Sequence, residues 1–83
     1  MPENLDICKM KIQERFGVVI RRLRIEKGIS QEKLALNADI DRTYISDIEK
    51  GNRNVSIEMI ERLANFFQIS VSELLKKVEE YGK

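Results

Sequence analysis

Apolar residues recur along this chain at intervals of three and four, which is the period of an α-helix. The first such stretch predicts a helix from about Lys9 to Lys27. Gly28 follows it directly and suits the left-handed position that often ends a helix. The inner face of this predicted helix consists of Ile12, Phe16, Val19, Ile20 and Leu23.

Two shorter helices are predicted next, from Gln31 to about Ala38 and from Arg42 to about Lys50. Ser30 and Asp41 stand just before them, where a side-chain oxygen can accept hydrogen bonds from the first backbone N–H groups. Gly51 is expected to end the second of these helices.

The remaining pattern predicts two further helices and no strand. Ser56 is the expected N-cap of the fourth helix, and Ser70 with Glu73 forms a capping box at the start of the fifth. With only one proline and four glycines, the sequence predicts an all-α domain of five helices spanning residues 1–83, with a core from about 9 to 80. The expected inner residues of the fourth helix are Ile57, Ile60, Leu63, Ala64 and Phe67, and the apolar positions of the fifth are Val71, Leu74, Leu75 and Val78.

Residues 31–50 have the pattern of a helix-turn-helix. Ala35 is small where two helices must cross closely, Ile40 fills the turn, and Asp39 tolerates the positive φ that such a turn often needs. Ile45 and Ile48 anchor the second helix. Its outward residues form one stripe of polar and basic groups: Arg42, Thr43, Ser46, Asp47 and Lys50.

Because an α-helix fits the major groove of B-DNA, this stripe predicts sequence-specific DNA binding. A polar outer stripe is also the ordinary property of a solvated helix, so a helical protein-interaction module is the alternative from another class. Binding to operator DNA, and not to random DNA, in a salt-dependent manner would distinguish the two.

Charge is unevenly distributed along the 83 residues, although the net charge is only +1. Residues 9–27 hold seven basic and two acidic side chains, whereas residues 57–83 hold four basic and five acidic ones. One end of the domain can therefore face phosphates while the other faces away. A near-neutral total argues against purely electrostatic binding to any DNA.

Several functional classes are disfavoured by composition. There is no histidine, and Cys8 is the only cysteine, so the chain offers neither an internal disulfide nor a metal cluster. No motif pairs a nucleophile with a base, which makes an enzyme the least favoured class. No apolar run approaches the length of a membrane span. We expect a cytoplasmic protein without a cofactor, a small-molecule ligand or a membrane partner.

The segments VIRRLRIEKGISQEKLA and IEKG, with five short helices, make the chain similar to the lambda-repressor-like (XRE/Cro-type) helix-turn-helix family over about residues 12–76. Within that family, DRTYIS (41–46), IEKG (48–51) and RNVS (53–56) resemble the controller proteins of restriction–modification systems. The resemblance implies a small homodimer that binds operator DNA and times expression of the restriction enzyme. Phage-type repressors and antitoxins that repress their own operons are alternatives within the family.

The resemblance also implies roles for individual residues. It places Gln31 on a backbone phosphate, and it pairs Arg24 with Glu49 between helices one and three. Asp39 departs from the glycine that many members carry in the turn. The resemblance implies base contacts for Arg42, Thr43 and Ser46, with Lys50 at the helix end, and DNA contacts for the loop residues Arg53 and Asn54. Independently of the resemblance, the candidate surface also includes Asp47 of the outer stripe, Asn52 of the loop, and Tyr44, which can lie partly in the core or donate to a phosphate.

A second copy of the chain is the other expected partner, because one helix contacts too few base pairs to select a single operator in a genome. Phe67 is the core candidate of its adjacent pair of phenylalanines. The surplus apolar residues proposed for a dimer interface are Phe66, Ile69, Val71 and Leu75. In the alternative, the fifth helix only closes the core of the monomer. Contact with RNA polymerase is left open.

Overall fold

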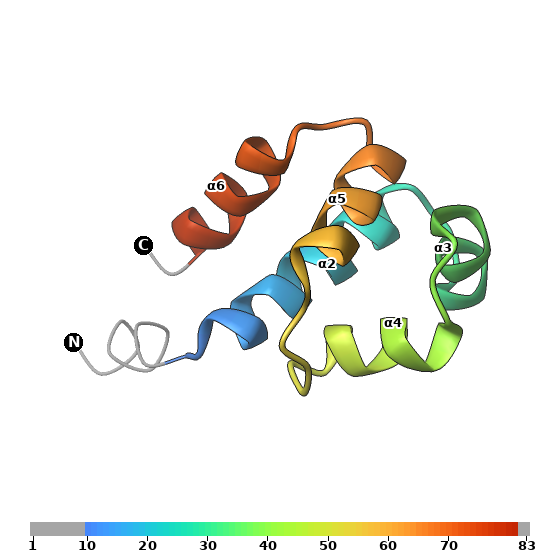
Figure 1. Cartoon of the computed structure of the whole chain (residues 1–83), viewed down its shortest axis with the longest axis horizontal. Coiled ribbons are helices and arrows are strands. Elements are labelled where there is room, and N and C mark those ends of the chain that lie inside the picture. Colours follow the sequence, from blue (N-terminus) through green and yellow to red (C-terminus); the bar gives the residue numbers. More distant parts are fainter. Residues whose placement is uncertain (1–9, 82–83) are drawn as a thin grey trace.

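The computed structural model describes residues 10–81, which form five α-helices and no strand (Figure 1). The helices are α2 (Ile12–Glu26), α3 (Gln31–Ala38), α4 (Arg42–Glu49), α5 (Ile57–Phe66) and α6 (Val71–Tyr81). The prediction of an all-α fold with five helices is therefore confirmed. The expected start of the first helix at Lys9 lies outside the described residues, as does Cys8; α2 begins at Ile12.

Local hydrogen bonds explain where the helices begin. All four predicted N-cap residues accept a hydrogen bond from a backbone N–H near the start of their helix, which satisfies a group that has no partner within the helix. The capping bonds run from Lys33 N to Ser30 Oγ (3.0 Å), Thr43 N to Asp41 Oδ1 (2.7 Å), Met59 N to Ser56 Oγ (3.1 Å) and Glu73 N to Ser70 Oγ (3.0 Å).

Residues with positive φ follow the ends of α2, α3, α4 and α5. Gly28 and Gly51 have φ of 69° and 77°, as their positions predicted. Asp39 has φ of 58°, so it adopts the left-handed conformation that glycine would adopt more easily. Arg62 Nη1 donates a hydrogen bond of 2.8 Å to the carbonyl of Asp39, which ties α5 to this turn. Gln68, with φ of 61°, plays the same role after α5 and was not predicted.

The core forms from the predicted inner faces of the helices, but two of the residues predicted on those faces are exposed. Ile12 and Ile57 were expected inside but are 58% and 82% exposed. Each is the first residue of its helix. Because Cα–Cβ bonds tilt toward the helix N-terminus, these side chains point past the end of the helix and miss the core. The buried apolar residues are Phe16, Val19, Ile20, Leu34, Ala35, Ala38, Ile40, Ile45, Ile48, Leu63, Ala64, Phe67, Leu74 and Val78.

The long helix α2 is the main packing partner of both α4 and α6. It packs against α4 on one side and α6 on the other, while α3 packs against α4 and α5 (Figure 1). The helix-turn-helix of α3 and α4 thus lies at the opposite end of the molecule from α6 (Figure 1). This arrangement leaves the outer face of α4 uncovered.

Gly17 sets how closely α2 and α4 approach, a role that the sequence did not reveal. A Cβ at this position would overlap the carbonyl oxygen of Ile48 and lie 3.0 Å from that of Glu49. Ala35, which was expected at a close helix crossing, is buried as well. The close contact at Gly17, however, is between α2 and the last turn of α4.

Replacing Gly17 should therefore destabilise the fold. We expect Gly17→Ala to lower the free energy of unfolding by about 1–3 kcal/mol, because the added methyl group forces α4 away from α2. Urea unfolding followed by circular dichroism measures this change. Arg21→Ala, an exposed site on the same helix, is the control and should shift stability by less than about 0.5 kcal/mol. A Gly17→Ala protein as stable as the parent would contradict the proposed close contact.

Candidate nucleic-acid interface

The outer face of α4 carries the predicted stripe. Ile45 and Ile48 are fully buried and fix the rotation of the helix about its axis. On the opposite side the side chains reach the surface to different degrees: Arg42, Thr43 and Lys50 are exposed, whereas Tyr44, Ser46 and Asp47 are half-buried. A short, rigidly anchored helix therefore presents donors and acceptors along one face.

The loop after α4 turns back along the same face. The backbone N–H of Asn52 donates to the carbonyl of Asp47 at 3.0 Å, and the positive φ of Gly51 allows this reversal. A Cβ on Gly51 would lie 2.9 Å from the Cα of Glu14, so the turn also packs tightly against α2. The exposed loop residues Asn52, Arg53 and Asn54 are consequently held beside α4.

Arg53 makes two contacts with α4 that the sequence did not predict. Its Nη2 lies 3.3 Å from Asp47 Oδ2, and its guanidinium carbon lies 4.4 Å from the centre of the Tyr44 ring. Three of the candidate residues thus form one cluster. The one available signal was Gly51, since a glycine stop brings the following residues back toward the helix that it ends.

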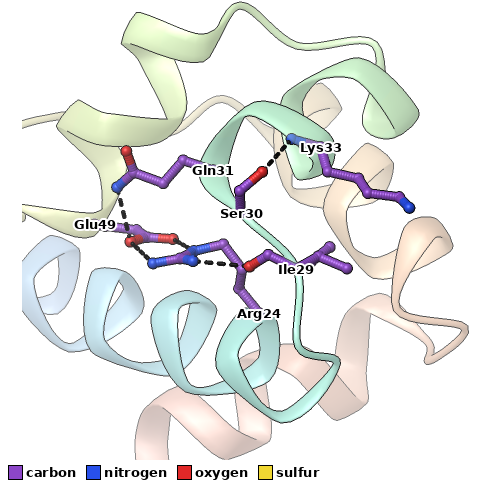
Figure 2. Close-up of polar contacts among 6 residues, drawn as sticks. All are labelled: Arg24, Ile29, Ser30, Gln31, Lys33 and Glu49. Atoms are coloured by element: carbon purple, nitrogen blue, oxygen red, sulfur yellow. Dashed lines mark hydrogen bonds and ion pairs between the residues drawn. The ribbon is translucent and has the colours of Figure 1, made fainter.

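The carboxylate of Glu49 joins three helices (Figure 2). Arg24 of α2 donates to it through Nε at 2.6 Å and Nη2 at 3.0 Å, while Gln31 Nε2 of α3 donates to Oε1 at 3.0 Å. Arg24 Nη1 also donates to the carbonyl of Ile29 at 2.9 Å, at the entry to α3 (Figure 2). The predicted Arg24–Glu49 pair is present, and its side chains are only 14% and 4% exposed.

The same network also keeps the Arg24 side chain in its charged form. The hydrogen bond to Glu49, aided by Coulomb attraction to it, raises the pKa of Arg24 above its ordinary value despite the opposing effect of burial. The guanidinium therefore stays charged. Gln31, predicted to hold a phosphate, is fixed at the first turn of α3 by the same carboxylate. The link from Gln31 to Glu49 was not predicted, because it joins side chains 18 positions apart.

The residues proposed for a dimer interface differ in their surroundings. Phe66, Ile69 and Val71 are half-buried and pack against the core of their own chain. Leu75 is 36% exposed. Phe67 is buried, as predicted, and meets the Phe66 ring edge-on with centroids 5.1 Å apart.

Within residues 10–81, no group of three or more His, Cys, Asp or Glu side chains is placed to hold a metal ion. None of the helices in this part of the chain is both long and apolar enough to span a bilayer.

The fold and the stripe on α4 define a helix-turn-helix protein. Residues 20–74 match the family described as Helix-turn-helix, and the chain belongs to this family of DNA-binding, XRE-type transcription regulators. Control protein C.BamHI of Bacillus amyloliquefaciens is 48% identical over 61 residues, which cover 72% of this chain and 75% of that protein.

Two solved structures extend the comparison. The restriction–modification controller protein C.AhdI of Aeromonas hydrophila is 44% identical and superposes with a TM-score of 0.71. The match covers 75% of this chain and 94% of the C.AhdI chain. Controller protein C.Esp1396I, solved as a tetramer in complex with its natural 35 base-pair operator, is 33% identical with a TM-score of 0.71, covering 87% of this chain and all of its own.

Removing the Glu49 carboxylate should destabilise the whole helix-turn-helix. We expect Glu49→Ala to lower the free energy of unfolding by about 2–4 kcal/mol, because it leaves the Arg24 charge largely buried without its partner. Equilibrium urea unfolding gives the value. Glu79→Ala, at an exposed site on α6, should change stability by less than about 0.5 kcal/mol. Equal midpoints for the two variants would rule out the three-helix role of Glu49.

Proposed function

We propose that this chain binds a palindromic operator as a homodimer and acts as the controller protein of a restriction–modification system. The observation that carries the proposal is the outer face of α4, which is anchored by buried isoleucines and flanked by the loop of residues 52–54. The similarity of the chain to controller proteins supports the proposal of a controller protein over other members of the family.

In this proposal α4 enters the major groove and supplies the base contacts. Arg42, in the first turn, offers a planar fork of donors that matches the O6 and N7 acceptors of guanine. Thr43 beside it can give its methyl group to thymine or its hydroxyl to a phosphate. Ser46, one turn further along, faces the same way, and Lys50 at the end of the helix meets the backbone.

Gln31 positions the protein on the DNA backbone. One N–H of its side-chain amide is bonded to Glu49, and the amide has a second N–H that can donate to a phosphate oxygen. It lies at the N-terminus of α3, where the helix dipole favours an anion. Since Glu49 also holds Arg24, the phosphate contact is coupled to the packing of α3 and α4 against α2.

A second copy is needed because one α4 contacts only a few base pairs. We infer the binding surface for this second copy from exposed apolar side chains. Ile12 and Leu75 line a groove of about 310 Å³ together with Phe16, Val55 and Ile60. We assign the partner to this groove. It shares Leu75 with the interface expected from the sequence, whereas Phe66, Ile69 and Val71 are already partly covered by their own chain.

Regulation would then follow the concentration of the protein itself, with no effector, cofactor or catalytic step. Dimer formation makes operator occupancy steeper than binding by a monomer. Two dimers on neighbouring sites would steepen it further, an arrangement for which the C.Esp1396I tetramer on its operator is a precedent. A promoter–reporter titrated against protein level, without added ligand, tests this scheme, and a flat response would overturn it.

Arg42 and Gln31 should differ in what they contribute to binding. Arg42→Ala is expected to weaken operator binding by about 1–3 kcal/mol and to relax the preference at one symmetric pair of base positions. Gln31→Ala should weaken binding to all sequences about equally. Competition binding against a set of single-base operator variants separates the two effects. If both proteins kept the parental sequence preference, Arg42 would not contact a base.

Leu75 offers a test of the dimer. Its side chain is exposed, so Leu75→Glu should leave the core intact while placing an unpaired charge in the apolar groove of the proposed interface. We expect sedimentation at micromolar concentration to show a dimer for the parent and a monomer for the variant. Ile25→Glu, another exposed apolar site but outside the groove, should remain dimeric. A monomeric parent, or a dimeric Leu75→Glu protein, would contradict this interface.

A further inference from the structure

We propose that Arg62 of α5 is a positioning residue for base recognition: it holds the turn between α3 and α4 in the geometry that presents Arg42 to a base edge, without contacting DNA itself. This inference rests on the proposed DNA-binding function. It gives a role to an arginine that lies outside both the stripe on α4 and the loop of residues 52–54.

The two ends of α4 are held in different ways. Its last turn is fixed on α2, where Glu49 bonds to Arg24 and Gly17 permits a close approach. Its first turn, which carries Arg42 and Thr43, directly follows the short connection of residues 39–41. The position of this end of the helix therefore depends on the conformation of that connection.

The backbone of this turn has a conformation that its residue type does not favour. Asp39 has φ of 58° and ψ of 48°, the left-handed region that costs a residue with a side chain more than it costs glycine. Ile40 is buried, and its N–H donates to the carbonyl of Ala35 at 2.9 Å. A hollow of about 320 Å³ nevertheless opens beside Asp39, lined by residues of α3, the turn and α5. Packing leaves the turn unsupported on this side.

Arg62 supplies the missing constraint. Its Nη1 donates to the carbonyl oxygen of Asp39 at 2.8 Å, across 23 positions of the chain. A hydrogen bond from a charged donor is stronger than one between neutral groups, and the C-terminal end of α3 carries a partial negative charge that favours a cation. Since α5 packs against both α3 and α6, the bond ties the turn to the body of the domain.

Base recognition is more sensitive to this constraint than backbone contact is. The guanidinium fork of Arg42 recognises a base only when both donors reach their acceptors, which requires placement to within about 0.5 Å. Contacts with phosphates carry no sequence information and tolerate small displacements. When a turn has a second conformation, affinity for the specific site falls in proportion to the fraction of protein whose helix is correctly placed. Loss of the Arg62 bond should therefore weaken binding to the specific site alone.

The test compares a duplex selected from a random pool by the parent protein with an unselected duplex of equal length. Arg62→Met, which keeps the apolar stem and removes the donors, is expected to bind the selected duplex about three- to tenfold more weakly. Its affinity for the unselected duplex should change by less than about twofold, and the slope of log affinity against log salt should stay the same. Lys76→Met removes the same charge from the exposed face of α6 and should leave both affinities within about twofold of the parent values.

A double variant tests whether the effect passes through Arg42. In an Arg42→Ala protein, Arg62→Met should weaken binding to the selected duplex by less than about twofold, because the side chain that the turn positions is gone. Circular dichroism confirms that each variant is folded under the binding conditions. Arg62→Gln, whose amide ends two bonds short of the Nη1 position, replaces Arg62→Met with the same expectations if the methionine variant does not fold.

An equal loss of affinity for both duplexes would overturn the proposal, and a salt slope smaller by about one would then assign Arg62 to a phosphate. A loss for the selected duplex that persists in the Arg42→Ala protein would show that the turn does not act through Arg42. No loss in either background would show that the turn needs no support from α5. Each of these results overturns the proposal while leaving the proposed function standing. A parent protein that binds both duplexes equally would instead overturn the proposed function, and this inference with it.

Discussion

The carboxylate of Glu49 links the three helices α2, α3 and α4 at the end of the molecule that we propose faces DNA. It sits at the end of α4, accepts two hydrogen bonds from Arg24 of α2 and one from Gln31 at the start of α3. Such a largely buried charge is stable only with its partners in place. Gly17 allows α2 to approach the last turn of α4 closely at this point. The relative position of the two helices in the motif therefore depends on this network.

Features that depend on neighbouring residues were predictable from the sequence, and features that depend on distant ones were not. The N-caps, the glycine stops and most of the core follow from local spacing. Ile12 and Ile57 obey the same spacing but begin their helices, so they point away from the core. The contact of Gly17 with α4 and that of Arg53 with Asp47 arise from how the chain turns back. The Arg24–Glu49 pair was predicted only because the family resemblance supplied it.

The surface so formed explains how a chain with a net charge of +1 can serve as a DNA-binding regulator. Two carboxylates, those of Glu49 and Asp47, each hold an arginine in place. The Arg24–Glu49 pair is largely buried and fixes the fold, whereas the Arg53–Asp47 pair is exposed to solvent. The near-neutral net charge limits attraction to arbitrary DNA and leaves discrimination to the contacts proposed for α4.

Selection of bound sequences from a random duplex pool tests whether this protein recognises a specific operator as a symmetric dimer. We expect enrichment of a palindrome whose half-sites are separated by about one helical turn, roughly 34 Å, since two α4 helices of a symmetric dimer must enter successive major grooves on one face. A pool that remains unenriched after repeated rounds at moderate salt, with folded protein, would show that the protein does not recognise DNA by sequence.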